Sequence, residues 1–532
     1  MKNLLTKHAV LLLTVCLGLM AKAEIVEYDG IRYETFNSNA KCLGPTGNKA
    51  SFTRNGLEIP SQVEFSDGLR DVVYIFPNAF QGCVNITGNL VLPSTVKSVG
   101  SYAFENCSGL TGTLDLSNFK SDGLSQAAFK GCSGFNKLIL SDEFIAITSE
   151  TFSGCSSLEG ELDLSNITET IQPEAFKDCV GFTSLILSTN VKQIYGKAFQ
   201  NCSGLKGDLT IPLLATSLGD YAFDGCTGLD GTLTFTAPTK LGNYAFRNCS
   251  FTGSLDLTNV TSIGQYTFQN CKGFTGEIYI PNTVTDLGTG MFRGCSGFNK
   301  LRLEDLNESI TTIPFNAFRE CSGLTGNLVI PNQITEINVA AFADCSGFDG
   351  TLTLSNNLNY IFAWAFRNCS KFTGTLTLPA SLTMMGEENS NTDYAYNAFD
   401  GCKGFTKLIF EAEEINYIPE YFFYNCEGLE GEIVIPRLNG EVKAIDQFAF
   451  AGCKNITSVK FGDDITNIGK EAFSGCENLK SIQLPSTIQD LKEKAFYGCT
   501  GLNIDFIIPE TVTNIGKIAL AIAVLQVSLF PT

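Results

Sequence analysis

One apolar pattern recurs along almost the whole chain. A short stretch that alternates apolar and polar residues is followed by Val-x-x-Ile-Gly, or a variant of it, and then by Ala-Phe-x-x-Cys. The Phe-x-x-Cys pair occurs eighteen times, from Phe80/Cys83 to Phe496/Cys499, almost always at steps of 22 to 27 residues. Self-similarity at this period is the signature of a solenoid, in which each turn packs on its neighbours. The pattern predicts one stack of turns, although length alone would suggest about three or four domains.

Residues 92–116 illustrate a single repeat. Leu114-Asp115-Leu116 predicts a short strand with one buried face, because its apolar and polar residues alternate. The Val-x-x-Val-Gly step is expected to cross the flank, and Ala-Phe-x-x-Cys to form a helical or 3₁₀ turn that places Phe104 and Cys107 inward. The predicted fold is an α/β solenoid of about 18 turns, with short parallel strands on the concave face and helical turns on the convex face.

The cysteines follow the same period. The chain has 20 cysteines, and eighteen of them hold one equivalent position per turn. Stacked turns are about 4.8 Å apart, which exceeds the Cβ separation of about 3.5–4.5 Å that a disulfide prefers. We therefore predict a ladder of unpaired, buried thiols, without bound metal. Cys42 lies outside the ladder, and the sequence leaves open whether it is free or paired.

The two ends depart from the repeat. Residues 1–23 predict a secretory signal peptide, with Lys2 and Lys7 before an apolar run and a small-x-small cleavage site. Residues 24–78 predict a β-rich cap, followed by the solenoid at 79–516. Residues 517–532 are apolar and atypical. They are interpreted either as a capping segment or as the product of a shifted reading frame.

Charge and composition exclude several classes of function. After cleavage the chain would carry 33 basic and 55 acidic residues, a net charge of −22. This charge repels nucleic acids and anionic membranes, and no transmembrane helix is expected in the mature chain. The one histidine, His8, lies in the signal segment, so histidine-dependent catalysis and histidine-ligated metals are excluded. We expect no enzyme activity, catalytic residue, cofactor or metal.

An enlarged repeat stands out near the middle of the chain. The step from Cys369 to Cys402 is 33 residues, and the additional residues around Glu387 to Tyr394 are polar and acidic. Insertions in repeat proteins project from one face and often bind ligands, but a solvated loop is the simpler interpretation. A smaller enlargement lies near Arg437 to Lys443.

The motifs resemble a known family. Leu209-Thr210-Ile211-Pro212 and Ala222-Phe223-Asp224-Gly225-Cys226 are similar to the repeats of BspA-like leucine-rich repeat proteins, a group of mainly bacterial surface proteins. The resemblance covers about residues 79–516. It implies a leucine-rich repeat solenoid that is exported to the cell surface or secreted, and that adheres to host matrix proteins or other cells.

The outward positions of the predicted strands form the candidate binding surface. A concave, extended surface suits a large protein or glycan, so we predict an adhesive binding protein, monomeric, with an extracellular protein or glycan as partner. A structural or glycan-binding surface component is the alternative. The competing explanation for the many threonines is the preference of β-branched residues for strands. The candidate ligand-binding residues are Asp115, Asp163, Asp208, Thr210, Thr232, Thr234, Asp256, Tyr279, Thr351, Thr353, Thr375 and Thr377.

Overall fold

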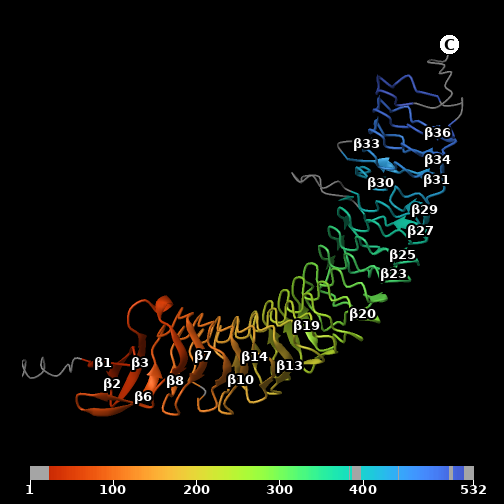
Figure 1. Cartoon of the computed structure of the whole chain (residues 1–532). Helices are drawn as coiled ribbons and strands as arrows, with labels where there is room; N and C mark the ends of the chain where they lie inside the picture. Colours follow the sequence, from red (N-terminus) through yellow and green to blue (C-terminus); the bar gives the residue numbers. More distant parts are fainter. Residues whose placement is uncertain are drawn as a thin grey trace, which may run out of the picture. The chain divides into compact units, whose positions relative to one another are not determined.

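A computed structural model describes residues 23–120, 122–382, 384–385, 397–440, 443–502 and 507–520. Contacts divide the chain into two compact units, which meet between Ser188 and Thr189 and are described separately. Within each unit, strands of successive turns lie side by side (Figure 1). The predicted signal peptide, apart from Ala23, lies outside the described residues.

The first unit begins with a small mixed sheet. Its strands are β1 (Ile25–Tyr28), β2 (Ile31–Phe36), β3 (Asn39–Pro45), β5 (Gln62–Phe65) and β6 (Gly68–Ile75), and a 3₁₀ helix spans Lys49–Ser51. β1, β2 and β3 are antiparallel neighbours, whereas β3 pairs with β6 in parallel. The end of β6 continues in parallel onto β8 (Ser98–Val99), so this sheet joins directly to the repeats.

The repeats of the first unit carry two parallel ladders. The longer strands are β4 (Arg54–Glu58), β7 (Ile86–Val91), β9 (Gly112–Asp115), β10 (Phe135–Ile139), β11 (Gly160–Leu164) and β13 (Phe182–Leu187). The shorter strands of two residues are β8 and β12 (Thr170–Ile171). β4 pairs with β7, so the stacking of turns begins before residue 79, in the segment that the sequence assigns to the cap.

The second unit repeats this arrangement. Its longer ladder corresponds to the longer strands of the first unit and consists of β15 (Leu209–Ile211), β17 (Leu233–Phe235), β20 (Glu277–Tyr279), β21 (Lys300–Arg302), β23 (Leu328–Val329), β25 (Leu352–Thr353), β27 (Gly374–Leu378), β29 (Phe405–Phe410), β31 (Gly431–Val434), β34 (Ile456–Lys460) and β36 (Ser481–Gln483). Two strands of this ladder, β23 and β25, have only two residues each. The longer ladder is discontinuous, because most of its strands pair in twos.

A second ladder runs through the Val-x-x-Ile-Gly segments, where no strand was predicted. Its strands in the second unit are β14 (Gln193–Ile194), β16 (Ser217–Leu218), β18 (Thr239–Leu241), β19 (Val260–Ile263), β22 (Thr312–Ile313), β24 (Glu336–Ile337), β26 (Tyr360–Ile361), β28 (Met384–Met385), β30 (Glu414–Ile415), β32 (Arg437–Leu438), β33 (Ala444–Ile445), β35 (Asn467–Ile468), β37 (Asp490–Leu491) and β38 (Asn514–Ile515).

The described repeats contain no helix, so the fold is a β-solenoid and the α/β description is not confirmed. Tyr244 and Asn248, which flank Phe246, have φ angles of 57° and 62°. A left-handed residue cannot continue a right-handed helix. Instead, Cys249 N–H bonds to the Phe246 carbonyl at 3.2 Å to close a β-turn, and Phe246 N–H bonds to Thr267 in the next turn at 2.9 Å.

The core of each turn is built from the Phe and Cys columns. Phe268 and Phe292, for example, are fully buried and stacked, with ring centroids 5.3 Å apart and ring planes 7° apart. Such offset stacking is favourable beyond the burial of area. The pairing of β27 with β29 is interrupted by a register shift between Gly374 and Thr375, which marks a bulge or irregularity at the start of the strands.

Candidate functional site

All twelve candidate residues have side chains that are exposed or partly exposed, and eleven of them lie on the longer strands or directly beside them. The twelfth, Asp256, lies in the segment 254–259, which forms no strand. Asp115 and Asp163 belong to the first unit, and the other ten to the second. Their apolar neighbours in the same strands, such as Leu209 and Leu233, point inward and are 3% exposed. The alternation that predicted these positions is therefore present.

Three of the candidate aspartates accept local hydrogen bonds from the main chain. Asp115, Asp163 and Asp256 each accept the main-chain N–H of the residue two positions later, at 2.9 to 3.0 Å. This is the Asx-turn geometry, which fixes the chain as it leaves the strand. These carboxylates have a structural role in addition to any contact with a ligand.

Asp208 binds the following turn. Its Oδ1 accepts the Thr232 N–H at 2.7 Å and the Thr232 hydroxyl at 2.8 Å. These bonds, the main-chain one first, lower the pKa of the Asp208 carboxyl. Asn327 holds Thr351 in the same manner, with its Oδ1 2.8 Å from the Thr351 N–H. Both pairs lie where one long strand begins to pair with the next.

The remaining threonines have free hydroxyls. Within the described residues no side-chain hydrogen bond is formed by Thr210, Thr234, Thr353, Thr375 or Thr377. Thr210 and Thr234 are direct partners across β15 and β17. They present two neighbouring hydroxyls on a backbone that is fixed by the ladder.

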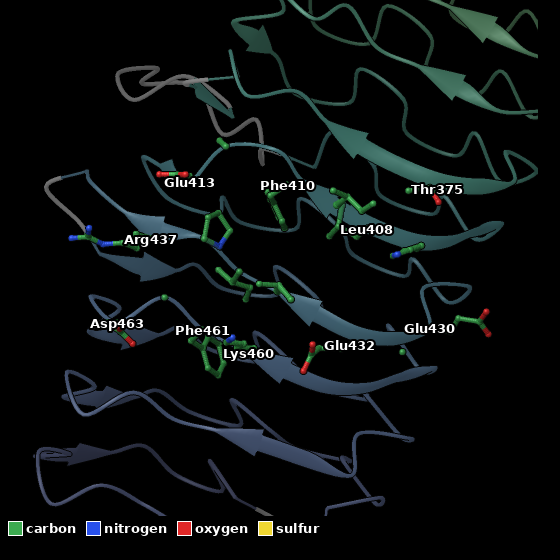
Figure 2. A pocket seen from close by; sticks show the side chains of 18 of the residues that line it. Thr375, Leu408, Phe410, Glu413, Glu430, Glu432, Arg437, Lys460, Phe461 and Asp463 are labelled. Carbon is green, nitrogen blue, oxygen red and sulfur yellow. The ribbon is translucent and has the colours of Figure 1, made fainter.

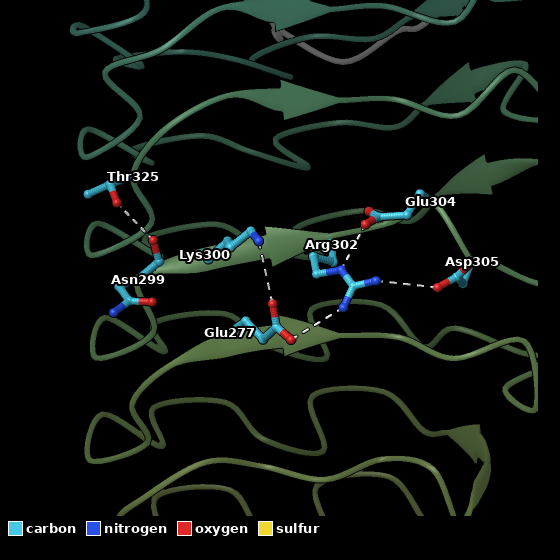
Figure 3. A network of polar contacts seen from close by, with 7 residues as sticks. All are labelled: Glu277, Asn299, Lys300, Arg302, Glu304, Asp305 and Thr325. Carbon is cyan, nitrogen blue, oxygen red and sulfur yellow. Dashed lines mark hydrogen bonds and ion pairs between the residues drawn. The ribbon is translucent and has the colours of Figure 1, made fainter.

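Tyr279 belongs to a polar network that the sequence did not predict, and Figure 3 shows the part of this network around Arg302. Its hydroxyl donates to Asp305 Oδ2 at 3.0 Å, and the Arg302 guanidinium lies 4.5 Å from its ring centroid. The hydrogen bond to Asp305 raises the pKa of Tyr279. A hollow of about 580 Å³ adjoins them, lined also by Asn282 and by residues 306–308.

Arg302 is the centre of this network. Its guanidinium nitrogens lie 2.7 Å from Glu304, 3.4 Å from Glu277 and 3.5 Å from Asp305. The hydrogen bond from Arg302 lowers the pKa of Glu304. No spacing rule in the sequence indicates this cluster, because its members come from two strands and a connecting segment.

A second hollow lies between β29 and β31, with a volume of about 980 Å³ (Figure 2). Its apolar lining includes Leu408, Phe410, Val434 and Phe461, and charged side chains surround it. Of the predicted residues, only Thr375 contributes to it. The sequence does not indicate this hollow, because the hollow forms where β29 and β31 are not joined by main-chain hydrogen bonds.

The thiols offer no reactive group. All nineteen described cysteines, including Cys42, are buried and none of them forms a disulfide, as predicted for the ladder. Burial raises the pKa of Cys155 and Cys271 to about 12, which keeps these thiols protonated at neutral pH. No cluster of three or more potential metal ligands occurs in the described part of the chain. Nor does that part contain a helix long and apolar enough to cross a bilayer.

Two sequence features fall partly outside the described residues. The insertion at 387–394 lies outside them completely. At the C-terminal end the repeat continues further than expected, since Ala519 is buried and its carbonyl accepts the Phe496 N–H at 3.0 Å. Residues 521–532, on which the reading-frame alternative mainly bears, are not described.

Comparison with known proteins identifies the repeat type. The model described as BspA type Leucine rich repeat region matches residues 73–206, 207–325, 297–392 and 392–523, in agreement with the resemblance of the motifs. A search of curated proteins finds no match.

Solved structures also match the chain. A leucine rich cell surface protein from Faecalibacterium prausnitzii is 20% identical with a TM-score of 0.47, over 73% of this chain and 95% of its own. A leucine-rich repeat protein from Bacteroides ovatus is 22% identical with a TM-score of 0.34, over 92% of this chain and 90% of its own.

Proposed function

Since the chain belongs to the family of BspA-type leucine-rich repeat proteins, we propose that it is an exported, cell-surface or secreted protein that binds a large extracellular protein. The ligand is recognised by the outward side chains of the longer strands in the second unit. Adhesion to matrix proteins or to other cells is the activity that such a surface would serve.

The free threonine hydroxyls are the observation that carries this proposal. The stability of a turn comes from its inward side, where the Phe, Cys and Leu columns are buried. The hydroxyls of Thr210 and Thr234 contribute nothing to that core and have no partner in the described structure. They are available to an external ligand, on a backbone that needs little ordering when it binds.

The experiment is a binding screen of the chain without residues 1–23. Immobilised matrix proteins, intact cells and soluble polysaccharides are compared by biolayer interferometry at physiological salt. Saturable binding to a matrix protein or to cells supports the proposal, and a negative result with every protein and cell preparation contradicts it.

The Tyr279 hollow favours glycan binding as a second candidate function. An aromatic ring, a carboxylate and asparagine side chains around one hollow provide the stacking surface and hydrogen-bonding groups that a sugar requires. Binding to polysaccharides alone, with loss of that binding in Tyr279→Ala, would favour this second function.

A further inference from the structure

We infer that the hollow between β29 and β31 accepts an extended peptide segment of the protein ligand, as an added β-strand. This inference deepens the proposed function, because it names the part of the ligand and the chemistry by which the second unit holds it. Four observations support it: the open strand edges, the closed ends of the hollow, its floor and its rim.

The open strand edges are evident from comparison with a closed pair. In β23 and β25, the Leu328 N–H bonds to the Thr351 carbonyl, and the Ile330 N–H bonds to the Thr353 carbonyl, both at 2.9 Å. The equivalent groups in the open pair are the N–H groups of Leu408 and Phe410 and the carbonyls of residues 432 and 434. No main-chain bond joins these groups within the described residues.

The hollow is closed at both ends. At the start of the strands, the Glu430 N–H bonds to the Thr406 carbonyl at 2.9 Å, and beyond their ends the Arg437 N–H bonds to the Glu413 carbonyl at 3.2 Å. Between these two bonds the main-chain groups alternate with the period of a strand. A polypeptide has donors and acceptors at that same period, so a peptide can bond to both edges.

The floor and the rim suit alternating side chains. Leu408, Phe410 and Ile435 form an apolar floor, as Figure 2 shows for the first two. Lys407, Glu432 and Lys460 are exposed on the rim. An extended peptide places alternate side chains on opposite faces. Its apolar residues would contact the floor, and its polar residues would meet the charged rim and solvent.

The volume agrees with this occupant. The hollow measures about 980 Å³, and sites of about 300–1,000 Å³ are usual for ligands of moderate size. β29 has six residues. A peptide of similar length spans about 20 Å when extended.

The probe is a six-residue peptide with valine at alternate positions, serine and lysine between them, and blocked ends. Hydrogen–deuterium exchange of the chain without residues 1–23 is measured with and without this peptide. We expect the Leu408 and Phe410 amides to exchange rapidly in the free protein and at least tenfold more slowly with the peptide. The Glu430 amide, already bonded, should be slow in both.

Two controls isolate main-chain pairing. The same peptide with N-methylated valines lacks the donors that would face the open carbonyls, and it should bind at least tenfold more weakly. Val434→Lys should weaken binding by at least tenfold, whereas Val329→Lys should leave it unchanged. The two valines are matched, being outward in their strands and 50% and 54% exposed.

Three results would overturn the inference. They are slow exchange of Leu408 and Phe410 in the free protein, equal binding of the N-methylated peptide, and protection of these amides by oligosaccharides but not by the peptide. A negative macromolecule screen alongside specific peptide binding would contradict the proposed function and leave this inference standing. Binding to a protein without protection of the Leu408 and Phe410 amides would support the proposed function and contradict this inference.

Discussion

The thiol of Cys271 donates a hydrogen bond to the main-chain carbonyl of Phe246, which lies in the preceding turn at 3.0 Å. The same contact recurs in other turns, for example from Cys499 to Phe473 at 3.1 Å. It gives the cysteine column a function that a small apolar residue could not provide. The thiol fills the core and also donates a second hydrogen bond to the carbonyl that closes the Phe-x-x-Cys turn of the preceding repeat.

Removal of that donor should destabilise the protein. Cys271→Ala removes one of the two donors to the Phe246 carbonyl, which keeps its bond from the Cys249 N–H, and also opens a small cavity. We therefore expect a loss of about 1–2 kcal/mol in the free energy of unfolding. Cys271→Ser retains a donor and should lose less. Urea denaturation followed by circular dichroism measures both. Equal losses in the two variants would show that the hydrogen bond from the thiol does not contribute to the free energy of unfolding.

High pH should destabilise the protein through the same column. Burial raises the pKa of Cys271 from the ordinary thiol value of 9.0 to about 12. Above pH 9 an unfolded thiol ionises while the folded thiol stays protonated, so the stability present below pH 9 is lost as pH rises toward 12. Each such thiol costs about 1.4 kcal/mol per pH unit in this window. Urea midpoints at pH 7, 9 and 10 test this, and an unchanged midpoint at pH 10 would contradict it.

The phenylalanine column should respond strongly to truncation. Phe246 is fully buried and stacks on Phe223 and Phe268, with centroid distances of 5.9 and 5.7 Å. Phe246→Ala should cost about 3–5 kcal/mol. Tyr497→Ala is the control, since Tyr497 is 48% exposed and its loss should cost less than about 1 kcal/mol. Thermal unfolding compares them, and similar costs would argue against a buried aromatic column.

Two glycines should differ in their tolerance of a side chain. A Cβ at Gly288 would lie 2.2 Å from the main-chain carbon of Gly264, whereas one at Gly276 meets nothing within 4 Å. Gly288→Ala must push two turns apart and should cost about 3 kcal/mol or more. Gly276 has a φ of +78°, a conformation that asparagine accepts, so Gly276→Asn should cost about 1 kcal/mol or less.

The Arg302 network should contribute little to stability. Arg302 and its partners Glu304 and Asp305 are partly or largely exposed, and exposed ion pairs typically contribute about 0–1 kcal/mol. Arg302→Gln should therefore unfold within about 1 kcal/mol of the parent protein. If the Tyr279 hollow binds a ligand, the same variant should weaken that binding. A large loss of stability would instead identify the network as structural.

Much of the fold could be predicted because the repeat period and the alternation are properties of the sequence alone. Leu209 and Leu233 were expected inward and Thr210 and Thr234 outward, and the structure has them so. The left-handed turns were not anticipated, because an aromatic residue such as Tyr244 rarely adopts a positive φ. The stacking of successive turns imposes the positive φ angle. The conformational preference of the single residue therefore does not predict it.

The site was less predictable than the fold. Outward residues can be identified from the alternation of apolar and polar residues in a strand. Whether an outward side chain already forms a hydrogen bond within the protein depends on the neighbouring turn. Thus Asp208 is bound to Thr232, while Thr210 has a free hydroxyl in the described structure. The hollow at Leu408 depends on main-chain pairing, which the side-chain pattern does not encode.

The most direct test of the account compares two double variants in their affinity for the first protein ligand found by the screen. Thr210→Arg/Thr234→Arg changes the outward strand surface, and Thr227→Arg/Ser250→Arg makes the same change at exposed positions after Cys226 and Cys249. Biolayer interferometry should show at least a tenfold loss for the first pair and no change for the second. Unchanged affinity in the first pair, or equal losses in both, would contradict recognition through the strands.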